Sequence, residues 1–191
     1  MSENKRELVL DAINGKKTSR VPVGFWFHFV HPEIKDAFAD ESIPQQNIDG
    51  HKHFFEKFQP DFVKLMSDGY FNYPNEILKN ISSADDLLKI KPLGKDHKWI
   101  RQQVELVKKQ RANFSYNPVT FYNLFSPATS LKILIGAFDN SAAKQEADLI
   151  IQNKEAVKYA FDVIAQDLSD LAQTVITEGG ADGIYLSAQN I

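Results

Sequence analysis

The sequence predicts an α/β fold in which helices alternate with the strands of a parallel sheet. Four short apolar runs, at residues 21–29, 61–68, 119–124 and 181–188, have the length and composition of buried strands. Helical patterns separate these runs, and the connections are too long for β-hairpins. Strands joined in this way form a parallel sheet with helices packed against it.

The first of these runs, VPVGFWFHF at residues 21–29, is apolar almost throughout. Such a run is typical of a strand that is covered on both faces. His28 and His31 lie toward its carboxyl end, which is where α/β folds place their functional side chains. Two interpretations remain open: the histidines form part of a site, or they only terminate a buried strand.

Proline and glycine residues mark the ends of the other predicted elements. Pro60 and Gly69 enclose the second strand, and Pro118 places the start of the third strand at Val119. The pair Gly179-Gly180 ends the clearest helix and precedes the fourth strand. Helices are predicted at residues 2–13, 50–58, 99–113, 129–138, 144–152 and 155–178.

The composition indicates one domain, residues 1–191, with a sizeable core. The chain is 43% hydrophobic, carries a formal net charge of −3 and has no cysteine. These values argue against nucleic acid as a partner and exclude disulfides and thiolate metal sites within the chain. Without a signal peptide or an apolar run of about 18 residues, we expect a cytoplasmic protein with no membrane segment. The 14 phenylalanines and 6 tyrosines indicate a thick aromatic core or an aromatic-lined pocket.

Four segments, in order, resemble the uroporphyrinogen decarboxylase family, whose superfamily includes cobalamin-dependent methyltransferases. They are KRELVLDAINGKKTSRVPVGFW, DFVKLMSDGY, TFYNLFSPATSLKILIG and EGGADGIYLSAQN. The resemblance implies a (β/α)₈ TIM barrel, of which this chain would supply about the first four βα units. Four strands cannot close a barrel, so the expected fold is a half or truncated barrel. Its open sheet edge would need a cover, such as a second copy of the chain in a homo-oligomer.

Asp68 is the first candidate for a catalytic residue, because it follows the second predicted strand and precedes a glycine. The resemblance implies that this aspartate binds the pyrrole nitrogens of a tetrapyrrole and stabilises the positive charge that develops on protonation. An anionic acceptor facing several N–H donors suits that role. The alternative interpretation is that Asp68 caps the following loop through an Asx turn.

The other residues expected at the ligand-binding mouth are His28, His31, Tyr70, Asn123 and Gln189. The family's first strand carries two arginines that bind substrate carboxylates. Phe27 and His31 occupy those positions here. The sequence therefore lacks the bidentate carboxylate clamp of the family. This departure argues against uroporphyrinogen itself as the substrate.

The expected function is that of a carbon–carbon lyase acting on a tetrapyrrole, or of a divergent member of the superfamily. One alternative is a corrinoid-dependent methyltransferase, and another is a non-catalytic protein that binds a tetrapyrrole or corrinoid ligand. No cofactor is expected for the decarboxylase, whereas the methyltransferase would involve a corrinoid. No metal site is predicted, because His51 and His53 resemble exposed residues of a surface helix.

Overall fold

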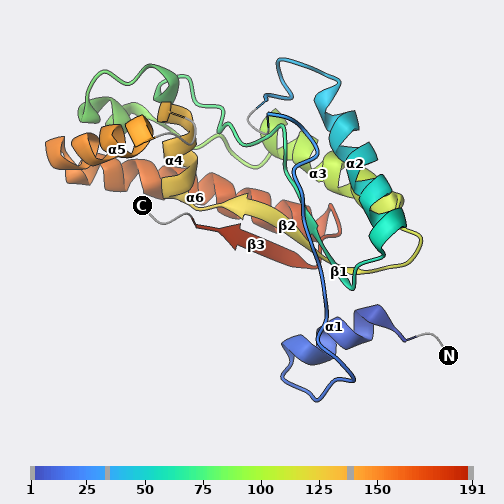
Figure 1. Ribbon diagram of the computed structural model, residues 1–191. Helices are drawn as coiled ribbons and strands as arrows, with labels where there is room; N and C mark the ends of the chain where they lie inside the picture. Colours follow the sequence, from blue (N-terminus) through green and yellow to red (C-terminus); the bar gives the residue numbers. More distant parts are fainter. Residues whose placement is uncertain (1–2, 33–34, 137–139, 189–191) are drawn as a thin grey trace.

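A computed structural model describes residues 3–32, 35–136 and 140–188 of the chain. Its centre is a parallel sheet of three strands, β1 (Phe62–Leu65), β2 (Val119–Phe125) and β3 (Gly183–Ser187), in the order β1-β2-β3 (Figure 1). Leu65 pairs with Tyr122, and Tyr122 pairs with Ile184. The second, third and fourth predicted strands are therefore confirmed, each at or near its predicted position.

Helices make up most of the remaining regular structure. They are α1 (Lys5–Ile13), α2 (Ile43–Phe58), α3 (Lys98–Ala112), α4 (Pro127–Gly136), α5 (Asn140–Gln152) and α6 (Lys154–Thr177). Two 3₁₀ helices, Leu78–Asn80 and Ala84–Lys89, lie between β1 and α3. Helix α2 begins seven residues earlier than predicted, with Pro44 in its first turn, where a missing N–H costs nothing.

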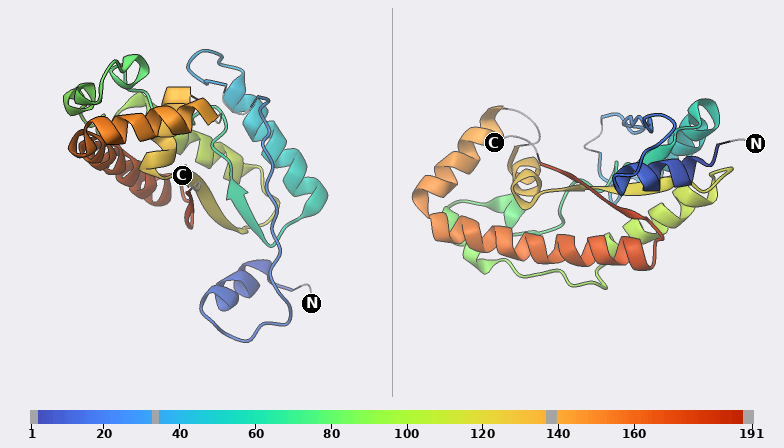
Figure 2. Two further views of the ribbon diagram at one scale, coloured as in Figure 1. Left: turned by 60° about the vertical axis from the view of Figure 1, so that its left-hand side comes forward. Right: turned by 90° about the horizontal axis from the view of Figure 1, so that it is seen from below.

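Helices α3 and α6 cover one face of the sheet (Figure 2). Tyr122 points to this side, because its hydroxyl donates to Gln103 Oε1 at 2.6 Å. Buried apolar residues fill the space between the sheet and these helices: Val63, Leu65, Ile100, Val104, Val107, Ile164, Leu168, Leu171 and Val175. One face of the sheet is therefore fully packed, so a binding site on the sheet has to form elsewhere than on this face.

The opposite face is only partly covered, and we call it the open face. Side chains alternate between the two faces of a strand, so Phe121 and Asn123 point away from Tyr122 and onto the open face. Lys64 pairs with Phe121, and Tyr185 pairs with Asn123, so these two residues lie on the same face.

The predicted barrel-type fold with four βα units is wrong, because the described residues form only three strands. Residues 20–30 are not a strand but an extended segment, which we call the strap. It runs from α1 past β1 to the opposite end of the sheet (Figure 1). The expectation that it is buried on both faces is also wrong, since Val21, Phe25 and Phe27 are 78%, 54% and 51% exposed.

Aspartate side chains explain why the strap does not pair as a strand. The N–H of Val23 donates to Asp61 Oδ2 at 2.8 Å, and the N–H of Phe29 donates to Asp68 Oδ2 at 2.7 Å. Pro22 has no N–H to offer. In the described strap, one backbone–backbone hydrogen bond remains, from Asp61 N–H to the Val23 carbonyl at 2.8 Å. These carboxylates thus replace the backbone hydrogen bonds to a neighbouring strand that the apolar pattern predicts.

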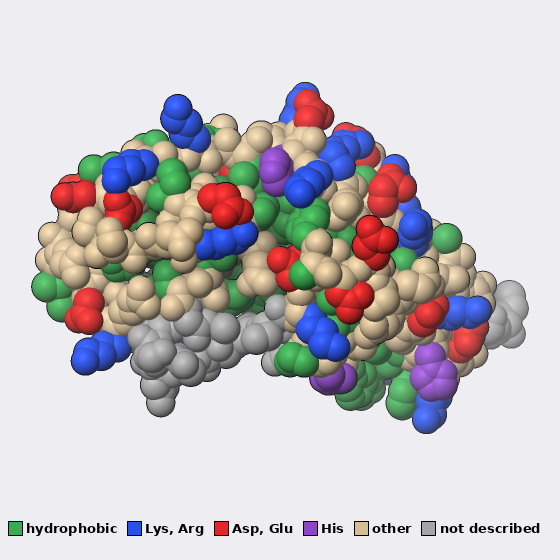
Figure 3. All heavy atoms as spheres, turned by 90° about the horizontal axis from the view of Figure 1, so that it is seen from above, with side chains coloured by type: hydrophobic (Ala, Val, Ile, Leu, Met, Phe, Trp, Pro, Cys, Tyr) green, Lys and Arg blue, Asp and Glu red, His purple; other side chains and the backbone are tan. Residues whose placement is uncertain are grey.

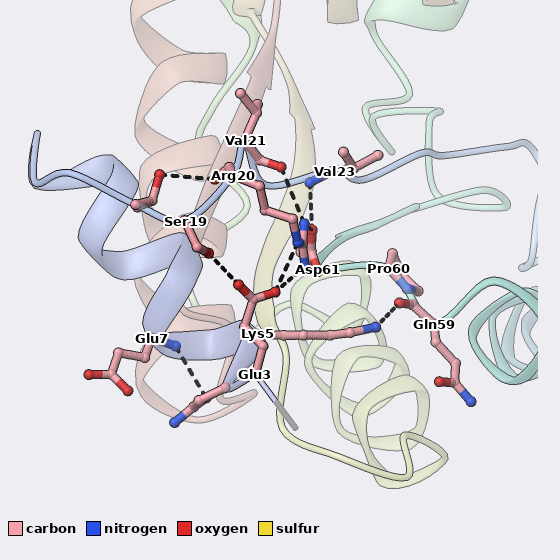
Figure 4. Close-up of polar contacts among 12 residues, drawn as sticks. Glu3, Lys5, Glu7, Ser19, Arg20, Val21, Val23, Gln59, Pro60 and Asp61 are labelled. Carbon is pink, nitrogen blue, oxygen red and sulfur yellow. Dashed lines mark hydrogen bonds and ion pairs between the residues drawn. The ribbon is translucent and has the colours of Figure 1, made fainter. Parts of the chain in front are cut away.

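The amino-terminal end of the strap is held by the Arg20 side chain (Figure 4). Its guanidinium donates to both oxygens of Asp61, at 2.5 and 2.8 Å, and to Glu3 at 2.9 Å. The hydrogen bond from Arg20 lowers the pKa of Asp61 and keeps this buried carboxylate ionised. This bidentate pair fixes the strap to the start of β1.

Candidate functional site

The strongest candidate site is a histidine–aspartate pair at the carboxyl end of β1. Asp68 lies three residues after the strand, and its Oδ1 is 2.9 Å from Nδ1 of His28 in the strap. An ionised carboxylate only accepts hydrogen bonds, so we assign the proton to Nδ1 of His28. This arrangement fixes the imidazole ring and leaves Nε2 free to contact a ligand, since the His28 side chain is 39% exposed.

Asp68 itself is fully buried, with both carboxylate oxygens engaged by His28 and the strap backbone. Burial raises the pKa of Asp68, and the hydrogen bond from His28 opposes this rise. In this arrangement Asp68 would act on a ligand through the imidazole. Its assignment as the residue that contacts the ligand stays a prediction.

Aromatic rings extend from this pair across the open face. His28 packs edge-on against Phe71 at 5.9 Å between ring centroids, and Phe71 packs against Phe125 of β2 at 4.9 Å. On the other side, Trp26 of the strap lies 5.5 Å from Tyr185 of β3. Trp26 and Tyr185 are 45% and 37% exposed, so a flat apolar ligand can reach both. Trp26 and Tyr185 are therefore surface aromatics, whereas Phe71 is buried in the core.

Asn123 lies between the two groups of rings, on β2. It is 1% exposed, and its Nδ2 is 3.3 Å from the hydroxyl of Ser67. Its amide Oδ1 has no hydrogen-bond partner among the described residues. Asn123, Ser67, Phe71 and Phe125 also line a cavity of about 10 Å³, which is room for one water. A single water in this cavity would satisfy the Asn123 Oδ1, and a larger ligand has no access to it.

Lys64, which the sequence did not single out, lies on the open face of β1. It is 7% exposed, and its Nζ is 4.7 Å from the Trp26 ring centroid and 4.0 Å from the Tyr185 centroid. Burial lowers the pKa of Lys64, an effect that the charge of Asp68 opposes. The available signal was the single lysine inside the apolar run FVKLM.

Three predicted residues remain, His31, Tyr70 and Gln189. His31 is exposed beyond the end of the strap. Tyr70 is buried and packs edge-on against Phe38. It lines both the small cavity beside Asn123 and a second cavity of about 310 Å³ beside α2 and α3. Burial raises the pKa of Tyr70 to about 12. Gln189 lies outside the described residues.

His51 corrects another expectation, because it is 1% exposed and not on the surface. Its Nδ1 lies 2.9 Å from the Asn47 carbonyl, and its Nε2 accepts the Met66 N–H at 3.0 Å. Gln110 of α3 also donates to the Met66 carbonyl at 3.0 Å. This buried network connects α2 and α3 to the end of β1. Burial lowers the pKa of His51 to about 4. His53 is exposed, as predicted.

The wider surface offers few other signals of function. Acidic and basic side chains are interspersed on the face seen in Figure 3. Within residues 3–32, 35–136 and 140–188, no group of three or more potential metal ligands is found. None of the described helices is long and apolar enough to cross a membrane.

Comparisons with known proteins give no match: no protein-family model, no curated protein and no solved structure matches this chain. The likeness to the uroporphyrinogen decarboxylase family therefore depends on the four sequence segments alone.

Proposed function

We propose that this protein is a divergent uroporphyrinogen decarboxylase-like protein that binds a tetrapyrrole over the open face of its sheet and transfers a proton through His28. The observation that carries the proposal is the hydrogen bond between His28 and the buried Asp68 at the carboxyl end of β1. Carboxyl ends of parallel strands are where α/β proteins bind their ligands.

The decarboxylation requires a proton donor beside a pyrrole ring of the ligand. Decarboxylation replaces a carboxylate by hydrogen: a proton is taken up, the bond to the carboxylate carbon breaks, and carbon dioxide leaves. His28 can donate this proton from Nε2, because Asp68 accepts from Nδ1 and stabilises the imidazolium. Asp68 is thus a positioning residue in this proposal.

The surrounding side chains suit a flat apolar ring. Trp26 and Tyr185 expose apolar faces on which such a ring can pack. Phe27 packs against Phe54 of α2 and cannot replace the family's first carboxylate-binding arginine. A ligand with fewer carboxylates than uroporphyrinogen fits these residues better.

The test is to incubate the protein with uroporphyrinogen and with less carboxylated porphyrinogens and to measure decarboxylated products. We expect His28→Gln to lower the turnover number about 100-fold, the lower end of what a positioned acid contributes. His53→Gln on the exposed side of α2 is the matched control and should leave turnover unchanged. Absence of product from every porphyrinogen would exclude the decarboxylase.

Methyl transfer involving a corrinoid is the second candidate, and the loss of both family arginines favours it. A corrinoid carries no carboxylate array that requires two bidentate clamps. Binding of a cobalamin without turnover of any porphyrinogen, lost in His28→Gln, would favour this second function.

A further inference from the structure

Lys64 differs from the other cations of the described protein. Lysines and arginines that form ion pairs there have side chains 24% to 66% exposed. Lys64 is 7% exposed and forms no ion pair with a described carboxylate. Buried charges in proteins are normally paired, because leaving water without a counter-charge is costly. Lys64 therefore lacks the partner that its burial calls for.

Three separate segments surround this ammonium group. Lys64 comes from β1, Trp26 from the strap and Tyr185 from β3, with Nζ 4.7 and 4.0 Å from the two ring centroids. Attraction to the two aromatic faces compensates part of the desolvation and keeps the ammonium in place. The ring faces lie on two sides of the cation, and its N–H groups make no hydrogen bond to a described residue.

From this geometry we propose that Lys64, Trp26 and Tyr185 form a binding site for a carboxylate attached to a flat apolar group. The ammonium would donate to the carboxylate, and the exposed parts of the two rings would pack against the apolar body of the ligand. The site would supply the cation that Phe27 and His31 fail to supply.

The proposal deepens the proposed function and rests on it for the natural ligand, but the carboxylate site can be tested without a tetrapyrrole. Benzoate is a suitable probe, and benzyl alcohol is its uncharged counterpart. The chain has two tryptophans, Trp26 in the site and the buried Trp99. In protein labelled with fluorotryptophan, fluorine NMR reports both, and Trp99 serves as the internal reference for an intact fold.

We expect benzoate to shift the Trp26 signal saturably, without moving the Trp99 signal, and to bind at least about tenfold more tightly than benzyl alcohol. Lys64→Met should weaken benzoate binding at least about tenfold and leave benzyl alcohol unaffected. Lys108→Met on the exposed side of α3 is the matched control and should bind benzoate as the parent does.

Equal affinity of the parent protein for benzoate and benzyl alcohol would overturn the proposal, whether or not any variant folds. Unchanged benzoate binding by Lys64→Met would also overturn it. These outcomes are separate from those of the porphyrinogen assay, because the carboxylate site can bind benzoate in a protein that decarboxylates nothing.

Discussion

The two ends of the strap are held by similar hydrogen bonds to aspartates, but the side chains that make these bonds differ. At each end, an aspartate next to β1 accepts hydrogen bonds from one backbone N–H and from one side chain of the strap. Asp61 receives Val23 N–H and the Arg20 guanidinium, whereas Asp68 receives Phe29 N–H and the His28 imidazole. The partner side chains distinguish the ends, since a guanidinium only donates hydrogen bonds, whereas an imidazole nitrogen can donate or accept one.

This difference appears in the pKa values of the two carboxyl groups. The hydrogen bond from Arg20 lowers the pKa of Asp61, whereas burial raises the pKa of Asp68. The ionised form of Asp61 therefore stabilises the fold above pH 3.8, and this contribution is lost as the pH falls. Ionised Asp68 carries a cost, which disappears as the pH falls through its raised pKa. The Asp61 end is therefore a structural clamp, whereas the Asp68 end is the one for which we propose proton transfer.

His51, which packs against Phe29 of the strap at 4.5 Å between ring centroids, sharpens the contrast with His28 and has the largest predicted effect. Its pKa falls from 6.5 to about 4, so its neutral form stabilises the fold fully above pH 6.5. This contribution of up to about 3 kcal/mol is lost as the pH falls from 6.5 toward 4. Urea unfolding across this range should show the loss in the parent protein.

His51→Gln should remove that pH dependence, whereas His53→Gln, at an exposed position of the same helix, should retain it. A parent protein whose stability stays constant between pH 6.5 and 4 would contradict the role assigned to the buried imidazole.

Arg20→Met tests the clamp and has the next largest effect. The substitution keeps an apolar stem but leaves Asp61 buried without its guanidinium, which should lower the free energy of unfolding. The loss should be smaller than the usual cost of breaking a buried pair, because the Arg20 side chain is 42% exposed. Chemical denaturation at neutral pH measures it.

Arg101→Met is the control, because the pair of Arg101 with Glu178 is exposed on both sides and should contribute less to stability than the Arg20–Asp61 pair. Equal losses of unfolding free energy in the two variants would show that the Arg20–Asp61 pair contributes no more than an ordinary surface ion pair.

The sequence predicted the sheet well because β1, β2 and β3 have apolar runs bounded by proline or glycine. It failed for the strap, because an apolar run cannot reveal that carboxylates elsewhere accept its N–H groups. The buried position of His51 was missed for a similar reason. His51 lies on the side of α2 that packs against Met66 at the end of β1, and the sequence does not show which element packs there.

Within the site, Asp68 and His28 could be named from their positions after apolar runs, but their contact could not. That contact depends on where the strap crosses β1, which is set by Arg20 and Asp61. Lys64 was overlooked because its partners, Trp26 and Tyr185, lie 38 and 121 residues away in the chain. Such long-range contacts leave no periodicity in the sequence.

The most direct test of this account compares the free energies of unfolding of Asp61→Asn and Asp68→Asn at neutral pH. Each substitution keeps the shape and an acceptor for the strap N–H while removing one buried charge. We expect Asp61→Asn to destabilise the protein by about 2 kcal/mol, and Asp68→Asn to change its stability by less than about 1 kcal/mol. Equal destabilisation by both variants would contradict the division of the strap into a structural end and a functional end.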